Sequence, residues 1–141
     1  IAEKAEDKFA LAVQLVEKAA AYGITPDRIH IDPLVLALSA VDNSALEFCK
    51  AIRMIKEKYP SINVTAALSN ISYGMPARKV VNISFLVMAI ESGLDSMIAD
   101  PLNRDSMGVM YATEALMQKD KYCRKYNKAY RKGIFGVKKT K

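Results

Sequence analysis

Helical and strand-like segments alternate along this chain, and the alternation limits the fold more than any other feature. Apolar residues recur with helical spacing in five segments, at about Glu3–Tyr22, Ser44–Lys58, Lys79–Ser92, Asp105–Met117 and Lys121–Tyr130. Short runs of β-branched and small apolar residues lie between them, at Ile29–Asp32, Asn63–Leu68 and Ser96–Ala99. Strands that alternate with helices form parallel sheets. We therefore predict an α/β fold with about three parallel strands.

Several residues mark where the predicted helices begin and end. Gly23 and Gly93 follow the first and third helices, as expected of glycines that terminate a helix in the left-handed conformation. The second helix is predicted to begin at Asn43 or Ser44. Glu47 lies three positions after Ser44, the spacing of a capping box.

A polar residue follows each predicted strand. The strands end in Asp32-Pro33, Ser69-Asn70 and Asp100-Pro101. Parallel α/β folds place their ligand sites at the carboxyl ends of the strands. Asp and Asn also begin loops and cap helices, and for Asp100 we favour this capping role. For Asp32 and Asn70 we favour ligand binding.

The sequence contains few residues suited to metal binding or disulfide formation. The two cysteines, Cys49 and Cys123, are far apart, and His30 is the only histidine. We predict no disulfide and no metal site, and expect a reducing, cytoplasmic setting. His30 lies two residues before Asp32 and is predicted to share its strand face, as a packed interior residue.

No membrane-spanning segment or signal peptide is predicted, because the longest apolar run, Ile83–Ile90, is too short to cross a bilayer. The chain begins with Ile1 inside a helical pattern. We expect it to be a segment of a longer protein or a processed chain.

The positive charge is concentrated at the end of the chain. Residues 1–120 carry twelve basic and fifteen acidic side chains, a net charge of −3, whereas nine basic and no acidic residues follow Asp120. Tyr122, Tyr126 and Tyr130 recur every four residues and are predicted to dock this last helix onto the body. A basic, aromatic surface for RNA is an alternative, but no nucleic-acid-binding motif supports it.

Three stretches of sequence resemble the methyltetrahydrofolate:corrinoid methyltransferases, relatives of the pterin-binding region of cobalamin-dependent methionine synthase. They read IHIDPLVLALS from Ile29, AALSNISYGMPARKVVNISFLVMAIESGLDSMIADP from Ala66, and ATEALMQKDKYCRKYNKAYR from Ala112. The resemblance implies the C-terminal half of a (β/α)8 TIM barrel. Residues 1–141 would form the C-terminal part of this pterin-binding domain, with residues 121–141 as a basic terminal helix and tail.

The resemblance also implies site residues. Asp32 matches the strand-end aspartate that hydrogen-bonds the pterin ring in this family, and Asn70 matches the asparagine whose amide approaches N5 of the pterin. Ser69, Ser72 and Arg78 belong to the same loop and are weaker pterin-binding candidates. Two further positions of this loop, Tyr73 and Ala77, depart from the polar amides found in well-known relatives.

The function that the resemblance implies is methyl transfer from 5-methyltetrahydrofolate to the cobalt of a corrinoid (cobalamin-type) cofactor carried by a partner protein. Asn70 would be the catalytic residue. Activity is expected only in a complete barrel, formed with a second copy of the chain or with a missing N-terminal half. The alternative is a non-catalytic half-barrel that serves as a folding or interaction module. A membrane partner is not expected.

Overall fold

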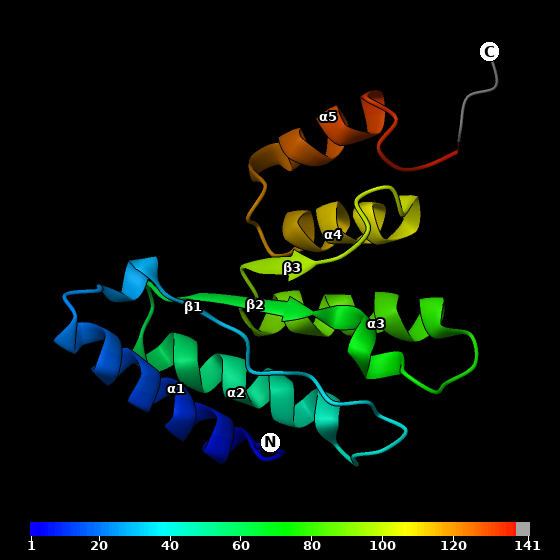
Figure 1. Ribbon diagram of the computed structural model, residues 1–141. Coiled ribbons are helices and arrows are strands. Elements are labelled where there is room, and N and C mark those ends of the chain that lie inside the picture. The colour runs from blue at the N-terminus through cyan, green and yellow to red at the C-terminus, as the bar shows by residue number, and fades with distance from the viewer. Residues whose placement is uncertain (138–141) are drawn as a thin grey trace.

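The structure is a computed structural model in which residues 1–137 are described (Figure 1). Five α-helices and three β-strands follow one another in this part of the chain. The helices are α1 (Ala5–Ala21), α2 (Ser44–Lys58), α3 (Arg78–Ser92), α4 (Arg104–Leu116) and α5 (Arg124–Arg131). The strands are β1 (His30–Ile31), β2 (Asn63–Ala67) and β3 (Ser96–Ile98). Three short 3₁₀ helices, η1 (Pro26–Arg28), η2 (Leu68–Ser72) and η3 (Lys121–Cys123), lie between these elements.

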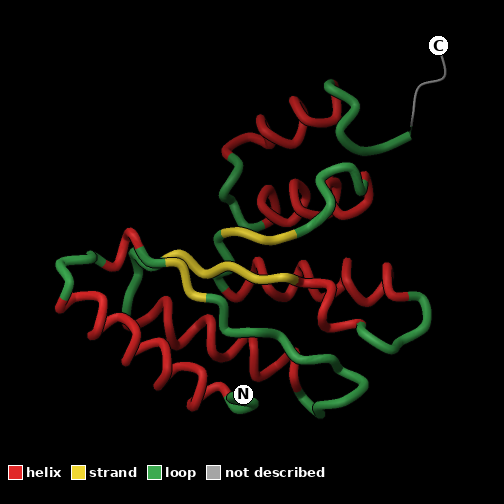
Figure 2. Tube along the Cα trace, in the orientation of Figure 1, coloured by secondary structure: helices red, strands yellow, loops and turns green. Residues whose placement is uncertain are grey.

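The three strands form one parallel sheet in the order β1-β2-β3, with β2 at its centre (Figure 2). His30 pairs with Asn63 across the first interface, and Ala66 pairs with Met97 across the second. Each connection between neighbouring strands contains a helix, as parallel pairing requires. The predicted α/β fold with three parallel strands is confirmed.

The helices cover only one side of this sheet. Ile31, Val64 and Ala66, which point toward the helices, are at most 7% exposed. In Figure 1, α3 lies behind the strands, α1 and α2 lie below them, α4 and α5 lie above, and no helix lies in front. His30 and Ile98 point to this open face and are exposed. His30 thus lies on the face opposite the helices, and its predicted packing in a barrel interior stays a prediction.

The core lies between the sheet, α2 and α3. Phe48 of α2 and Phe85 of α3 meet with ring centroids 5.4 Å apart. Around them lie other fully or nearly fully buried apolar residues, among them Ile52, Ile55, Ile62, Val64 and Ala89. Each large apolar side chain buried in this way contributes about 1.5–3 kcal/mol. Burial in this core also raises the pKa of the Cys49 thiol, whereas Cys123 is exposed and not bonded to it.

The helix ends follow the sequence signals in part. Gly23 has a φ of 72° and Gly93 a φ of 112°, so both terminate their helices in the left-handed region as predicted. The predicted capping box at the start of α2 is wrong. Asn43 itself adopts a left-handed conformation without a side-chain cap, and the Glu47 carboxylate instead accepts a hydrogen bond from the Ala5 N–H, 2.7 Å away.

The connection from α4 to α5 also differs from the prediction. Left-handed residues Tyr122 and Cys123 interrupt the helix expected over Lys121–Tyr130, and α5 begins only at Arg124. Burial opposes ionisation of Asp120. Hydrogen bonds from the Lys125 and Tyr126 N–H groups outweigh this and hold the pKa of its carboxyl below the usual range.

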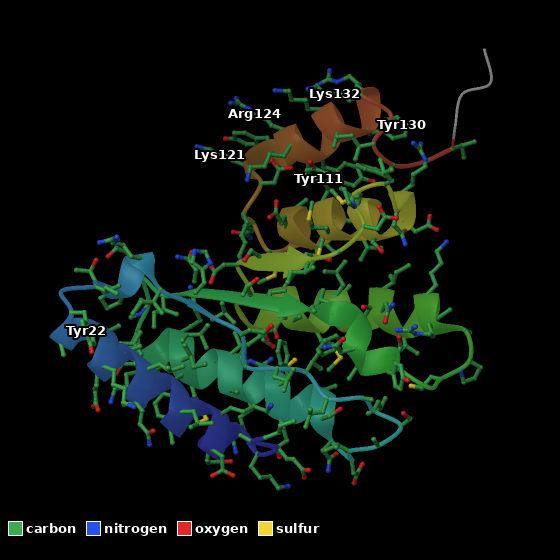
Figure 3. The ribbon with its side chains drawn as sticks, viewed as in Figure 1. Tyr22, Tyr111, Lys121, Arg124, Tyr130 and Lys132 are labelled. Atoms are coloured by element: carbon green, nitrogen blue, oxygen red, sulfur yellow. The ribbon has the colours of Figure 1, made fainter. Side chains whose placement is uncertain are left out.

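The tyrosine stripe of the last helix is only partly a docking surface. Tyr126 and Tyr130 pack on Phe135 with ring centroids 4.9 and 5.9 Å away, but Tyr122 is 76% exposed. The basic side chains of this region lie on the outer side of the molecule, as Lys121, Arg124 and Lys132 do in Figure 3. The remaining tail lysines, Lys138, Lys139 and Lys141, lie outside the described residues.

The two helix-ending glycines allow a matched test of the fold. A Cβ at Gly93 would lie 3.2 Å from Cγ of Lys56, whereas a Cβ at Gly23 would meet nothing within 4 Å. Gly23→Ala should lower the free energy of unfolding by about 1–2 kcal/mol, the cost of a left-handed L-residue. Gly93→Ala should cost more, because a close contact is added to this backbone term. Urea unfolding would measure both, and equal losses would contradict the close packing of α3 on α2.

Candidate functional site

The predicted ligand residues follow β1 and β2, the two neighbouring strands. Asp32 comes directly after β1, and Ser69 and Asn70 lie in η2, which follows β2. Because the strands are parallel, their carboxyl ends lie at the same edge of the sheet. This edge is on the right in Figure 1, where the arrow of β2 runs into η2.

Asn70 presents its side chain to solvent. The 3₁₀ turn from Leu68 to Ser72 buries Leu68, Ile71 and Ser72 and leaves Ser69 and Asn70 exposed. Within residues 1–137, the Asn70 carboxamide forms no hydrogen bond, and its backbone carbonyl accepts one from the Tyr73 N–H at 3.1 Å. The amide is therefore available to donate to a ligand or to accept from one.

Ser72 and Arg78 hold this turn in shape. The Arg78 guanidinium donates from Nε to the Ser72 hydroxyl at 3.0 Å and from Nη2 to the Ser69 carbonyl at 2.9 Å. The Ser72 hydroxyl, which is fully buried, donates to the same Ser69 carbonyl at 3.2 Å. In this structure both side chains support the turn that carries Asn70. Pterin contacts of Ser69, Ser72 and Arg78 stay predictions.

Asp32 is also exposed at the sheet edge. Its Oδ1 accepts a hydrogen bond from the Leu34 N–H at 2.8 Å, which closes a turn at the end of β1. Its Oδ2 forms no hydrogen bond within the described residues, so this oxygen is available to a ligand. A carboxylate in this position can bind a donor-rich ring edge through charge-assisted hydrogen bonds.

The two strand-end loops are tied to each other. The Leu38 N–H donates to the Ile71 carbonyl at 2.9 Å, and the Ser39 hydroxyl donates to the Tyr73 carbonyl at 2.7 Å. Gly74 permits this approach, because a Cβ there would lie 3.3 Å from the Ser39 oxygen. The loop after Asp32 is thus fixed relative to the turn that holds Asn70.

The hollows at this edge contain residues that the sequence analysis missed. Asp32 borders an apolar groove of about 250 Å³ beside α1, and Ser69 borders two hollows of about 340 and 260 Å³ between α3 and α4. Asn82, Asn103 and Ser106 line both of the latter. The Asn82 Oδ1 is buried without a hydrogen-bond partner in the described residues. Asn82 lies four residues after Arg78, a spacing that places both on one face of a helix. This spacing is the sequence signal that could have identified Asn82 as a site residue.

Asp100, at the end of β3, does not have the predicted capping role. Its Oδ1 accepts from the Leu102 N–H at 2.9 Å and so begins a turn. The cap of α4 is Asn103, whose side chain accepts from the Ser106 N–H at 3.2 Å. The helix starts three residues later than a cap at Asp100 would require.

Within residues 1–137, no three His, Cys, Asp or Glu side chains gather where they could hold a metal ion. None of the helices there is both long enough and apolar enough to cross a membrane.

Comparison with known proteins places these features in a family. Residues 2–100 match the family model described as pterin binding enzyme. A Eubacterium limosum protein named methylcorrinoid:tetrahydrofolate methyltransferase is 47% identical over 136 residues, which is 96% of this chain and 50% of that protein. Methionine synthases of Mycobacterium tuberculosis and Mycobacterium leprae are 33% identical over 115 residues, 73% of this chain and 10% of theirs. The chain thus spans half the length of the first relative and a tenth of the other two.

The support of the Asn70 turn can be tested by removing one hydroxyl. Ser72→Ala should lower the free energy of unfolding by about 1 kcal/mol or more, because a buried hydroxyl with two hydrogen bonds is lost. Ser69→Ala, which removes an exposed hydroxyl from the same turn, should change it by less than about 0.5 kcal/mol. Urea unfolding of both variants measures the difference, and a loss as large in Ser69→Ala would refute the assigned support.

Proposed function

The chain belongs to the family of pterin-binding enzymes, and from this premise we propose that it forms the folate site of a methyltransferase. The methyl group passes between 5-methyltetrahydrofolate and the cobalt of a corrinoid that a partner protein carries. The observation that carries the proposal is the exposed, unbonded carboxamide of Asn70 beside the Asp32 carboxylate loop at one sheet edge. The name of the Eubacterium limosum relative gives its reactants as a methylcorrinoid and tetrahydrofolate.

Asn70 is the proposed catalytic residue because the departing nitrogen needs a hydrogen bond that changes during the reaction. The C–N bond at N5 of the pterin breaks only if the developing negative charge on nitrogen is stabilised. A carboxamide can rotate to accept or to donate, so it can follow N5 from the ground state to the transition state. The rigid 3₁₀ turn below Asn70 limits this freedom to the side chain.

Asp32 is proposed to bind the pterin ring rather than to transfer a proton. The amide and amino groups of the ring are donors, and the free Oδ2 of Asp32 can accept a charge-assisted hydrogen bond from one of them. The methyl acceptor is the corrinoid cobalt, so the residues of this chain bind and orient the folate and exclude water. Since the same groups stabilise the transition state in both directions, the site serves methylation and demethylation of the pterin alike.

The bare face of the sheet supports a proposal about assembly. β1 and β3 each have one neighbour within the described residues, and the face that carries His30 and Ile98 is uncovered. We infer that residues 1–141 are one part of a barrel, with residues 121–141 as its basic terminal extension. A second copy or further sequence of the same protein completes it. The same bare face also supports the alternative, a non-catalytic module that binds a partner through this face.

The catalytic assignment predicts a specific kinetic signature. In the assembled protein, Asn70→Ala should lower kcat by about 100-fold or more, in the range seen when one transition-state hydrogen-bond donor is removed. KM for methyltetrahydrofolate should change by only a few-fold. Methyl transfer to a free corrinoid, followed by its absorbance, measures both constants.

Asn127→Ala is the matched control, because Asn127 is exposed on α5 and no part of the proposed site. It should leave kcat and KM unchanged. If Asn70→Ala weakened binding as much as it slowed transfer, the role at N5 would be refuted, although folate binding at this edge would stand.

The assembly proposal predicts that folate binding depends on association. Native mass spectrometry of the chain should show methyltetrahydrofolate only on an associated form, and Asn70→Ala should reduce the bound fraction. A single chain that binds one methyltetrahydrofolate as tightly as the associated form would contradict the need for a completed barrel.

A further inference from the structure

One lysine is buried at the end of β1. Lys8, in the first turn of α1, is 7% exposed. Its ammonium donates hydrogen bonds to the carbonyl oxygens of Pro33 and Leu34, each 2.7 Å from Nζ. Lysine is among the residues least often buried, because removing its charge from water is costly unless the ammonium is bonded. Here two backbone carbonyls of a single turn provide the bonds.

This turn is the one that carries Asp32. Leu34 adopts a left-handed conformation with a φ of 51°, which is unfavourable for an L-residue other than Asn or Asp. Its N–H donates to Oδ1 of Asp32 at 2.8 Å. The unfavourable turn is thus held on both sides, by the Asp32 carboxylate on the N–H of Leu34 and by the Lys8 ammonium on the carbonyls.

The start of α1, which carries Lys8, is held in place by α2. α1 runs antiparallel to β1, so its first turn lies beside the end of the strand (Figure 1). Glu47 of α2 accepts from the Ala5 N–H at 2.7 Å and lies 3.7 Å from the Lys4 ammonium. Burial lowers the pKa of Lys8, while the carboxylates that face it, Asp32, Glu47 and Glu3, act in the opposite direction.

We propose that Lys8 is a positioning residue that sets the direction of the Asp32 carboxylate. Its ammonium fixes the Asp32–Leu34 turn, and this leaves Oδ1 engaged with the backbone and Oδ2 directed to the ligand. The inference rests on the proposed function for its effect on pterin binding. The effect of Lys8 on the Asp32–Leu34 turn is measured separately, in the absence of ligand.

The first experiment measures the turn itself. In the chain with Lys8→Met, the Leu34 amide should exchange with solvent about tenfold faster than in the wild type, because the turn opens locally. Lys8→Arg, which keeps a cationic donor, should restore most of this protection. Lys50→Met is the matched control, since Lys50 is exposed on α2 and bonds Glu6. It should leave Leu34 unchanged.

A wild-type measurement keeps the test valid if Lys8→Met does not fold. NMR of the lysine ammonium groups should show slow proton exchange at Lys8 and rapid exchange at Lys50, because only the former is buried and bonded to carbonyls. Fast exchange at Lys8, or unchanged Leu34 exchange in a folded Lys8→Met chain, would overturn the inference.

The second experiment separates positioning from general stabilisation. In the assembled protein, Lys8→Met should weaken methyltetrahydrofolate binding about tenfold, and Lys8→Arg should restore it. In an Asp32→Ala background, Lys8→Met should cause no further loss, because Lys8 acts through Asp32. Additive losses would contradict positioning. Absence of folate binding in the wild-type assembly would refute the proposed function instead, whatever the exchange at Leu34 and Lys8.

Discussion

The structure depends on the pairing of β2 with a parallel neighbour on each side. Val64 and Ala66 of this strand are fully buried against the helices. The strand is anchored where it begins by Asp95, which accepts from the Val64 N–H at 2.8 Å and donates its own N–H to the Val64 carbonyl at 3.0 Å. Lys56 of α2 bonds the same Asp95 carboxylate at 3.0 Å. One carboxylate therefore links the central strand to the segment before β3 and to a helix.

Parallel pairing has a direct consequence for function. All connections that leave the carboxyl ends of the strands emerge at one edge, so the loops that carry Asp32 and Asn70, far apart in sequence, come to the same edge of the sheet. Hydrogen bonds from Leu38 and Ser39 to the β2–α3 loop then fix the two loops relative to each other. The sheet supplies the placement, and these short contacts supply the rigidity that a binding site requires.

Sequence reasoning recovered the architecture because it rests on local signals. Alternating apolar periodicity and the glycines at 23 and 93 are properties of short segments, and the strands and helices lie within a few residues of the predicted bounds. The same reasoning missed contacts between distant segments. Glu47 bonds the start of α1 instead of its own helix, and Lys8 reaches the turn after β1, because helix packing brings them there. Nothing in the local sequence distinguishes either side chain from a solvated charge.

We propose that the pterin binds between the Asp32 carboxylate and the Asn70 amide at the carboxyl edge of the sheet. A crystal structure of the assembled protein with methyltetrahydrofolate tests it most directly. We expect N5 to lie within hydrogen-bond distance of the Asn70 side chain and the ring amide or amino group to bond Asp32. A pterin that contacts neither residue, for example one seated between α3 and α4 on Asn82 and Asn103, would contradict it.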